Sequence, residues 1–297
     1  MAVTFALTLP PNYPTEHVLG YHQRDAWQLS EKRDGQTLQK AFMLQGTPTL
    51  LALDFSAQRV SVRMDSPHES AQTAMATHTV QRMLGLAQDI DAFEQAYHDH
   101  PVIGAVIQRQ SGLRVAATVT PFEALAWAII GQQISVSAAV AIRRRLIKTA
   151  GQTHDSGLWC HPGPTDILAT TPEQLRAAGL SNAKTQTLLH VSRAVDTGAL
   201  PLDEWLEEDT ADWEARRAAL QSIRGVGPWT ADYTLLRGYG WLDGSLHGDA
   251  AVRRSLGLLL ESEQPLSQQF ARTWLEPFTP WRALVGAHLW AANRIQA

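Results

Sequence analysis

The chain has 297 residues, of which 44% are hydrophobic and 18% are charged, a composition typical of a globular protein with a substantial core. Its single cysteine, Cys160, excludes an internal disulfide, a four-cysteine zinc site and a four-cysteine iron–sulfur cluster. The formal net charge of −4 argues against nucleic-acid binding through a broad positive surface.

The first part of the chain predicts an antiparallel sheet. Alternating hydrophobic segments are separated by turn residues, and they lie at 5–9, 26–30, 37–44, 49–55 and 59–64. Residues 70–110 then show the periodicity of helices. We therefore expect an α+β domain over residues 1–115.

The remainder of the chain, residues 116–297, predicts an all-α region. Thr120, Thr171, Ser181 and Thr210 stand where helix N-caps are expected. Helices are predicted at about 121–132, 135–149, 172–179, 181–197, 210–222, 228–237, 250–260, 265–276 and 280–293. Nine of the ten tryptophans follow residue 120, so this region holds most of the aromatic surface.

A tight turn joins two of these helices at "IRGVGPW", residues 223–229. Gly225 and Gly227 permit a positive φ and close approach of another backbone. Pro228 suits the first position of the second helix, whose free N–H groups form a ready anion site. A G-x-G pattern alone is equally compatible with an ordinary helix corner.

A carboxylate follows 20 positions after Trp229, at Asp249. An aspartate before "AAVRRSL" is a good helix N-cap, and Arg253 is placed to pair with it. An ionised carboxylate also stabilises the positive charge that develops on a sugar when an N-glycosidic bond breaks. The two roles are compatible.

The stretch "LQSIRGVGPWTADY" resembles the helix–hairpin–helix motif of DNA glycosylases. With "TPFEALAWAIIGQQISVSAA" (120–139), "LRAAGLSNAKTQTLLHVSRAV" (175–195) and "PWRALVGAHLW" (280–290), it is similar to the AlkA-type 3-methyladenine DNA glycosylase II family. The resemblance spans most of the chain. It implies an N-terminal antiparallel α+β domain like half of a TATA-binding protein, followed by two helical subdomains that flank an active-site cleft.

The resemblance also implies roles for individual residues. Asp249 would be the catalytic carboxylate, and Trp229, Tyr233 and Trp290 would form the pocket for a flipped base. Gly225, Gly227 and Thr230 would contact DNA at the hairpin. The backbone carbonyls of Gln221, Ile223 and Gly225 would hold a Na⁺ or K⁺ ion there, with no cofactor for the chemistry and no iron–sulfur cluster.

Two departures from related patterns refine the expectation. Family members that also cut the DNA backbone carry a lysine in "GVGxKTA", whereas this chain has Trp229 in "GVGPWTA", which favours a monofunctional enzyme using water. The loop after "IIGQ" inserts a side chain into the base gap in the family. Here Gln132 is followed by Gln133 and Ile134, so an amide occupies the expected wedge position.

We therefore expect a monomeric enzyme that flips alkylated, cationic purines such as 3-methyladenine out of damaged double-stranded DNA and hydrolyses them off. The absence of a basic leader and of a long apolar run predicts a cytoplasmic, nucleoid-associated protein without membrane contact. Two alternatives stay open. One is a DNA-binding module without chemistry, and the other is a glycosylase for deaminated or oxidised purines.

Overall fold

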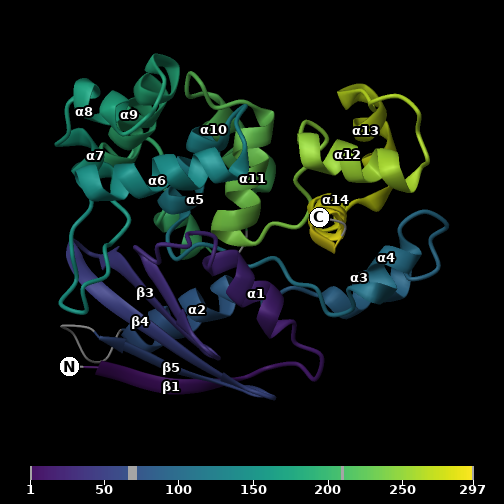
Figure 1. Cartoon of the computed structure of the whole chain (residues 1–297), viewed down its shortest axis with the longest axis horizontal. Helices are drawn as coiled ribbons and strands as arrows, with labels where there is room; N and C mark the ends of the chain where they lie inside the picture. Colours follow the sequence, from purple (N-terminus) through teal and green to yellow (C-terminus); the bar gives the residue numbers. More distant parts are fainter. Residues whose placement is uncertain (1, 66–71, 209–210, 296–297) are drawn as a thin grey trace.

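The computed structural model describes residues 2–65, 72–208 and 211–295. The protein has a five-stranded sheet. In Figure 1 the sheet lies below a large group of helices, and a second group, α12–α14, stands beside the first. The described chain thus combines an antiparallel sheet with a helical region, as the α+β prediction requires. Among the described residues, no helix is long and apolar enough to cross a bilayer.

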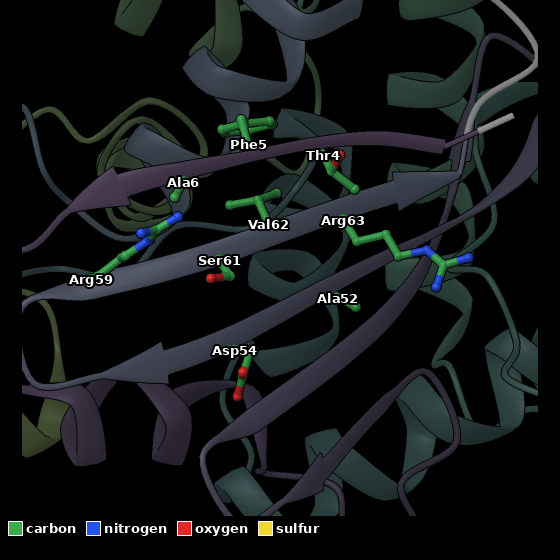
Figure 2. A pocket seen from close by; sticks show the side chains of 9 residues that line it. All are labelled: Thr4, Phe5, Ala6, Ala52, Asp54, Arg59, Ser61, Val62 and Arg63. Atoms are coloured by element: carbon green, nitrogen blue, oxygen red, sulfur yellow. The ribbon is translucent and has the colours of Figure 1, made fainter.

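The sheet is antiparallel throughout and has the strand order β1-β5-β4-β3-β2. The strands are β1 (Ala2–Thr8), β2 (Glu31–Asp34), β3 (Thr37–Leu44), β4 (Thr47–Ser56) and β5 (Arg59–Asp65). Alternate residues such as Val60 and Val62 point inward, where α1 (Thr15–His22) and α2 (Gln72–Met83) cover them. The opposite face carries small and polar side chains, among them Thr4, Ser61 and Arg63 (Figure 2).

One predicted strand is wrong. Residues 26–30 form turns, and β2 begins only at Glu31. The carboxylate of Asp25 explains the difference, because it accepts the N–H of Trp27 at 3.1 Å and pairs with Arg144 at 2.5 Å. The hydrogen bond to Trp27 is a local alternative to strand pairing, and the pair with Arg144 holds it in place.

The helical prediction for 70–110 resolves into three short helices, although residues 70 and 71 lie outside the described part. They are α2, α3 (Ile90–Tyr97) and α4 (Gly104–Arg109). Phe93 and Ile107 of the last two pack in the same apolar cluster as α14. Helices α3 and α4 precede the predicted boundary at 115/116, yet they pack against the C-terminal group of helices.

The helical region follows the predicted pattern, with one further helix at 164–168 that was not predicted. Its helices are α5 (Pro121–Gly131), α6 (Val136–Ala150), α7 (Pro164–Leu168), α8 (Pro172–Ala177), α9 (Asn182–Asp196), α10 (Trp213–Gln221), α11 (Pro228–Tyr239), α12 (Ala250–Leu259), α13 (Gln268–Leu275) and α14 (Arg282–Ile295). Thr120, Thr171 and Ser181 are N-caps whose hydroxyls accept an N–H three residues on, at 3.2–3.3 Å. Thr210 lies outside the described residues, and Asp212 caps α10.

A buried ionic cluster joins the sheet to the helices. Lys40 of β3 contacts Glu31 at 2.5 Å and Glu123 at 2.9 Å, and Arg143 of α6 contacts the same two carboxylates at 2.7 and 2.8 Å. All four side chains are buried, so removal of one would leave an uncompensated charge. The cluster fixes the sheet against α5 and α6 and thereby positions the segments around the candidate site.

Candidate active site

Asp249 lies at the N-terminus of α12, where the sequence places it. Its φ and ψ are −73° and 126°, the extended conformation of an N-cap residue. Carboxylate atom Oδ1 accepts the backbone N–H groups of Ala251 at 2.8 Å and Val252 at 3.0 Å. The capping role is therefore confirmed, and it fixes the direction in which the carboxylate points.

Two indoles complete the environment of this carboxylate. The Nε1–H of Trp229 on α11 donates to Oδ2 at 3.0 Å, and the Nε1–H of Trp290 on α14 donates to Oδ1 at 3.0 Å. The expected ion pair with Arg253 is wrong, because that guanidinium donates to the carbonyl of Leu266 at 3.0 Å. The hydrogen bonds that hold this carboxylate thus come from neutral groups.

The three aromatic residues assigned to the base pocket lie in a row. The ring centroids of Trp229 and Tyr233 are 5.3 Å apart, and those of Tyr233 and Trp290 are 6.0 Å apart. Trp229 and Tyr233 share a face of α11 because they are four residues apart. The row brings electron-rich rings next to Asp249, an arrangement that attracts a cationic planar ligand.

Sequence reasoning missed the groups behind this row. Tyr21 of α1 lies between two guanidinium groups, with Arg24 at 4.2 Å and Arg237 at 4.3 Å from its ring centroid. Arg237 also lies 5.4 Å from the ring of Trp290, and Arg24 lies 4.2 Å from the ring of Trp127. No sequence motif marks Tyr21 or Arg24 as part of this site, because they lie far along the chain from Trp229, Tyr233 and Trp290.

The hairpin between α10 and α11 uses its two glycines differently. Gly225 has φ +97°, and a Cβ there would collide with the hydroxyl of Thr187 on α9, so glycine is required. Gly227 has φ −88°, so it does not use the positive φ that a glycine permits. A Cβ on Gly227 would meet no atom within 4 Å, which leaves the first turn of α11 open to an approaching ligand.

The loop between α5 and α6 is tied to this hairpin. The amide of Gln132 donates to the carbonyl of Gly225 at 3.0 Å and to the hydroxyl of Thr230 at 2.9 Å. Thr230 is buried, so its hydroxyl serves to hold the loop. Gln133 is exposed with φ +56°, and Ile134 is 37% exposed, so both side chains of the predicted wedge project from the surface.

Two of the three carbonyls predicted to bind a monovalent cation already accept a hydrogen bond. The Ile223 carbonyl accepts the N–H of Val226 at 3.0 Å, and the Gly225 carbonyl accepts the amide of Gln132. A carbonyl oxygen has two lone pairs, so each keeps one for a cation. With the carbonyl of Gln221, these neutral oxygens fit Na⁺ or K⁺.

The sequence matches two families. Residues 126–280 match the HhH-GPD superfamily base excision DNA repair protein, and residues 4–120 match the AlkA N-terminal domain. The chain is 28% identical over 190 residues to DNA-3-methyladenine glycosylase 2 of Escherichia coli strain K12, an alignment that covers 63% of each protein. It is 22% identical to a Bacillus subtilis strain 168 DNA-3-methyladenine glycosylase over 96% of this chain and 95% of that protein.

Solved structures share the fold. The 3-methyladenine DNA-glycosylase from Archaeoglobus fulgidus superposes with a TM-score of 0.83 over 99% of each chain, at 20% identity. A Schizosaccharomyces pombe 3-methyladenine DNA glycosylase in complex with abasic DNA superposes with a TM-score of 0.59, over 68% of this chain and 97% of that one, at 22% identity. At these identities the similarity concerns the fold.

Proposed function

Because the chain belongs to the HhH-GPD superfamily of base excision DNA repair proteins, we propose that it is a DNA N-glycosylase that releases alkylated purines such as 3-methyladenine from duplex DNA. The observation that carries this proposal is the Asp249 carboxylate, which two indole N–H groups hold beside a row of aromatic rings. A DNA-binding module without chemistry would need neither the carboxylate nor the rings.

The proposed reaction is hydrolysis of the N-glycosidic bond. The bond from C1′ of the sugar to the base nitrogen breaks, and the base leaves with the electron pair. An alkylated purine that carries a positive charge thereby leaves as a neutral molecule, so no general acid for the base is needed. The carboxylate of Asp249 stabilises the oxocarbenium-like sugar and orients a water molecule, whose oxygen bonds to C1′ while its proton passes to solvent.

The aromatic row would recognise the flipped base. Stacking against Trp229, Tyr233 and Trp290 favours a cationic ring by up to about 2 kcal/mol when the pair is desolvated. The wedge loop would fill the gap that the base leaves, because Gln133 and Ile134 project beside the hairpin. With Trp229 where strand-cutting relatives carry a lysine, the product is an abasic site in an intact strand.

The hairpin would hold the DNA backbone. The open first turn of α11 presents N–H groups to a phosphate, and a Na⁺ or K⁺ ion at the carbonyls of Gln221, Ile223 and Gly225 would add a positive charge there. This mode of binding needs few basic side chains, which is compatible with the net charge of −4.

The direct test is incubation of the pure protein with methylated duplex DNA, followed by chromatography of the released bases. We expect 3-methyladenine in the soluble fraction. Parallel duplexes with hypoxanthine or 8-oxoguanine test the alternative lesion classes. Release of those bases but of no methylated purine would assign the protein to another lesion, and binding without any release would favour the non-catalytic module.

A further inference from the structure

A cleft lies between the α10–α11 hairpin unit and α13. Its volume is about 320 Å³. Three arginines from three different helices line it, Arg217 of α10, Arg272 of α13 and Arg282 of α14, together with His247 from the segment that leads to Asp249. None of these residues belongs to the base pocket described above.

Two of the arginines are held rigidly by buried or half-buried carboxylates. Arg217 contacts Asp232 through Nε at 2.6 Å and Nη2 at 3.3 Å, and Arg282 contacts Asp243 through Nε at 2.8 Å and Nη2 at 3.0 Å. Each guanidinium therefore keeps its Nη1 donors. The Nη1 of Arg217 also forms an ion pair with Glu214 at 3.7 Å, a separation longer than a hydrogen bond.

The other two groups have free donors or ring nitrogens. The side chain of Arg272 forms no hydrogen bond or ion pair with the described part of the chain and is exposed at the rim. The Nδ1 of His247 contacts the Ser245 hydroxyl at 2.9 Å, which leaves Nε2 for a ligand. Burial lowers the pKa of His247, and the charges of Arg272, Arg217 and Arg282 lower it further. The three arginines and this imidazole line the same cleft.

Carboxylates also border the cleft, at Glu214 and Glu276. Neither pairs with Arg272, although Glu276 lies only four residues after it. An arginine fork with unused N–H groups is suited to a phosphate, which accepts several charge-assisted hydrogen bonds at once. The cleft thus brings guanidinium groups from three helices to one lining.

We propose that this cleft binds a phosphodiester of the DNA backbone, next to the phosphate held at the hairpin. Gln221 and Pro228, which flank the hairpin, also line the cleft, so a strand bound at the hairpin passes its opening. Arg272 is the main ligand, and Arg217, Arg282 and His247 supply the remaining donors. The inference rests on the proposed function in one respect, that DNA is the substrate.

The test is the salt dependence of binding to a duplex with a stable abasic-site analogue. The slope of log K against log [salt] is negative, and the loss of one phosphate contact makes it shallower by about 1. We expect this change for Arg272→Gln. The matched control is Arg63→Gln on the outer face of the sheet (Figure 2), which should leave the slope unchanged. Glu276→Gln removes a carboxylate from the rim and should tighten binding.

Equal slopes for the wild type and Arg272→Gln, with no gain from Glu276→Gln, would overturn the proposal. Inorganic phosphate distinguishes a second source of the same chemistry. If it raises the melting temperature of the wild type but not of Arg272→Gln, while the DNA slopes are equal, the cleft takes free phosphate and the DNA assignment is wrong. Base release from methylated DNA is measured in parallel. If no base is released but the slope of Arg272→Gln differs from that of the wild type, only the proposed function is contradicted.

Discussion

The substitution Asp249→Asn separates the charge of the carboxylate from its structural role. Asparagine is as good an N-cap as aspartate, so its side-chain oxygen can still accept the N–H groups of Ala251 and Val252. The same oxygen can accept the indole N–H of Trp290. The amide nitrogen then faces the indole N–H of Trp229, which is also a donor, so that one hydrogen bond is lost.

The expected magnitudes differ between folding and catalysis. Loss of one hydrogen bond that leaves a donor unsatisfied costs about 1–3 kcal/mol of folding stability. The effect on the reaction is larger, because a unit negative charge about 4 Å from the developing sugar cation contributes about 4 kcal/mol at an effective dielectric constant of about 20. Each 1.36 kcal/mol is a factor of ten, so base release should slow by about three orders of magnitude.

The assay is single-turnover release of 3-methyladenine from a methylated duplex, with enzyme in excess. Binding to an abasic-site duplex and the thermal melting temperature are the controls, since Asp249→Asn should retain binding and remain folded at the assay temperature. Release within about tenfold of the wild-type rate would refute the assignment of Asp249, because a group of that charge and position could not then be stabilising the transition state.

Four further outcomes are expected. Because residue 229 is tryptophan, borohydride treatment should trap no covalent protein–DNA adduct, and a stoichiometric adduct on a denaturing gel would contradict the monofunctional mechanism. Gln133→Ala should weaken binding to abasic-site duplex by roughly 1–3 kcal/mol and binding to undamaged duplex far less, whereas equal losses in a titration would point to Ile134 as the wedge. Lys40→Met should lower the urea unfolding free energy by about 3–5 kcal/mol, because it removes one of the two cations that neutralise the buried carboxylates of Glu31 and Glu123, and an unchanged midpoint would disprove this role. Burial would raise the pKa of Glu31, but the charges of Arg143 and Lys40 outweigh it and lower the pKa to about 2. The ionised carboxylate therefore stabilises the fold above the ordinary pKa of 4.5, and this stabilisation is lost as the pH falls from 4.5 towards 2. Melting temperatures that stay constant across that pH range would be inconsistent with this role.

Local features of this protein were predictable from its sequence. N-caps such as Thr120 and Asp249 depend on a side chain and backbone groups two or three residues away, so spacing alone indicates them. The shared face of Trp229 and Tyr233 follows from the helical repeat. The residues of the hairpin and their resemblance to a known motif predicted an anion site at the start of α11, and the family match agrees with that motif.

Local reading failed where a distant contact decided the backbone conformation. The segment 26–30 has the alternation of a strand, yet Asp25 turns it into a loop by bonding to Trp27 and to Arg144, which is 119 positions away. Arg253 stands four residues after Asp249, but its guanidinium meets the carbonyl of Leu266 instead. In both cases a partner outside the local window offered the better geometry.

The arrangement of the site itself was decided by tertiary structure. Trp290 reaches Asp249 across 41 positions, and Gln132 reaches Thr230 across 98, because α11 packs between α5 and the C-terminal helices. Tyr21 arrives from the sheet domain, which a buried ionic cluster fixes against α5 and α6. Which side chains of distant segments meet depends on how whole helices pack, and the free energy of that packing is spread over many small contacts that no short stretch of sequence contains.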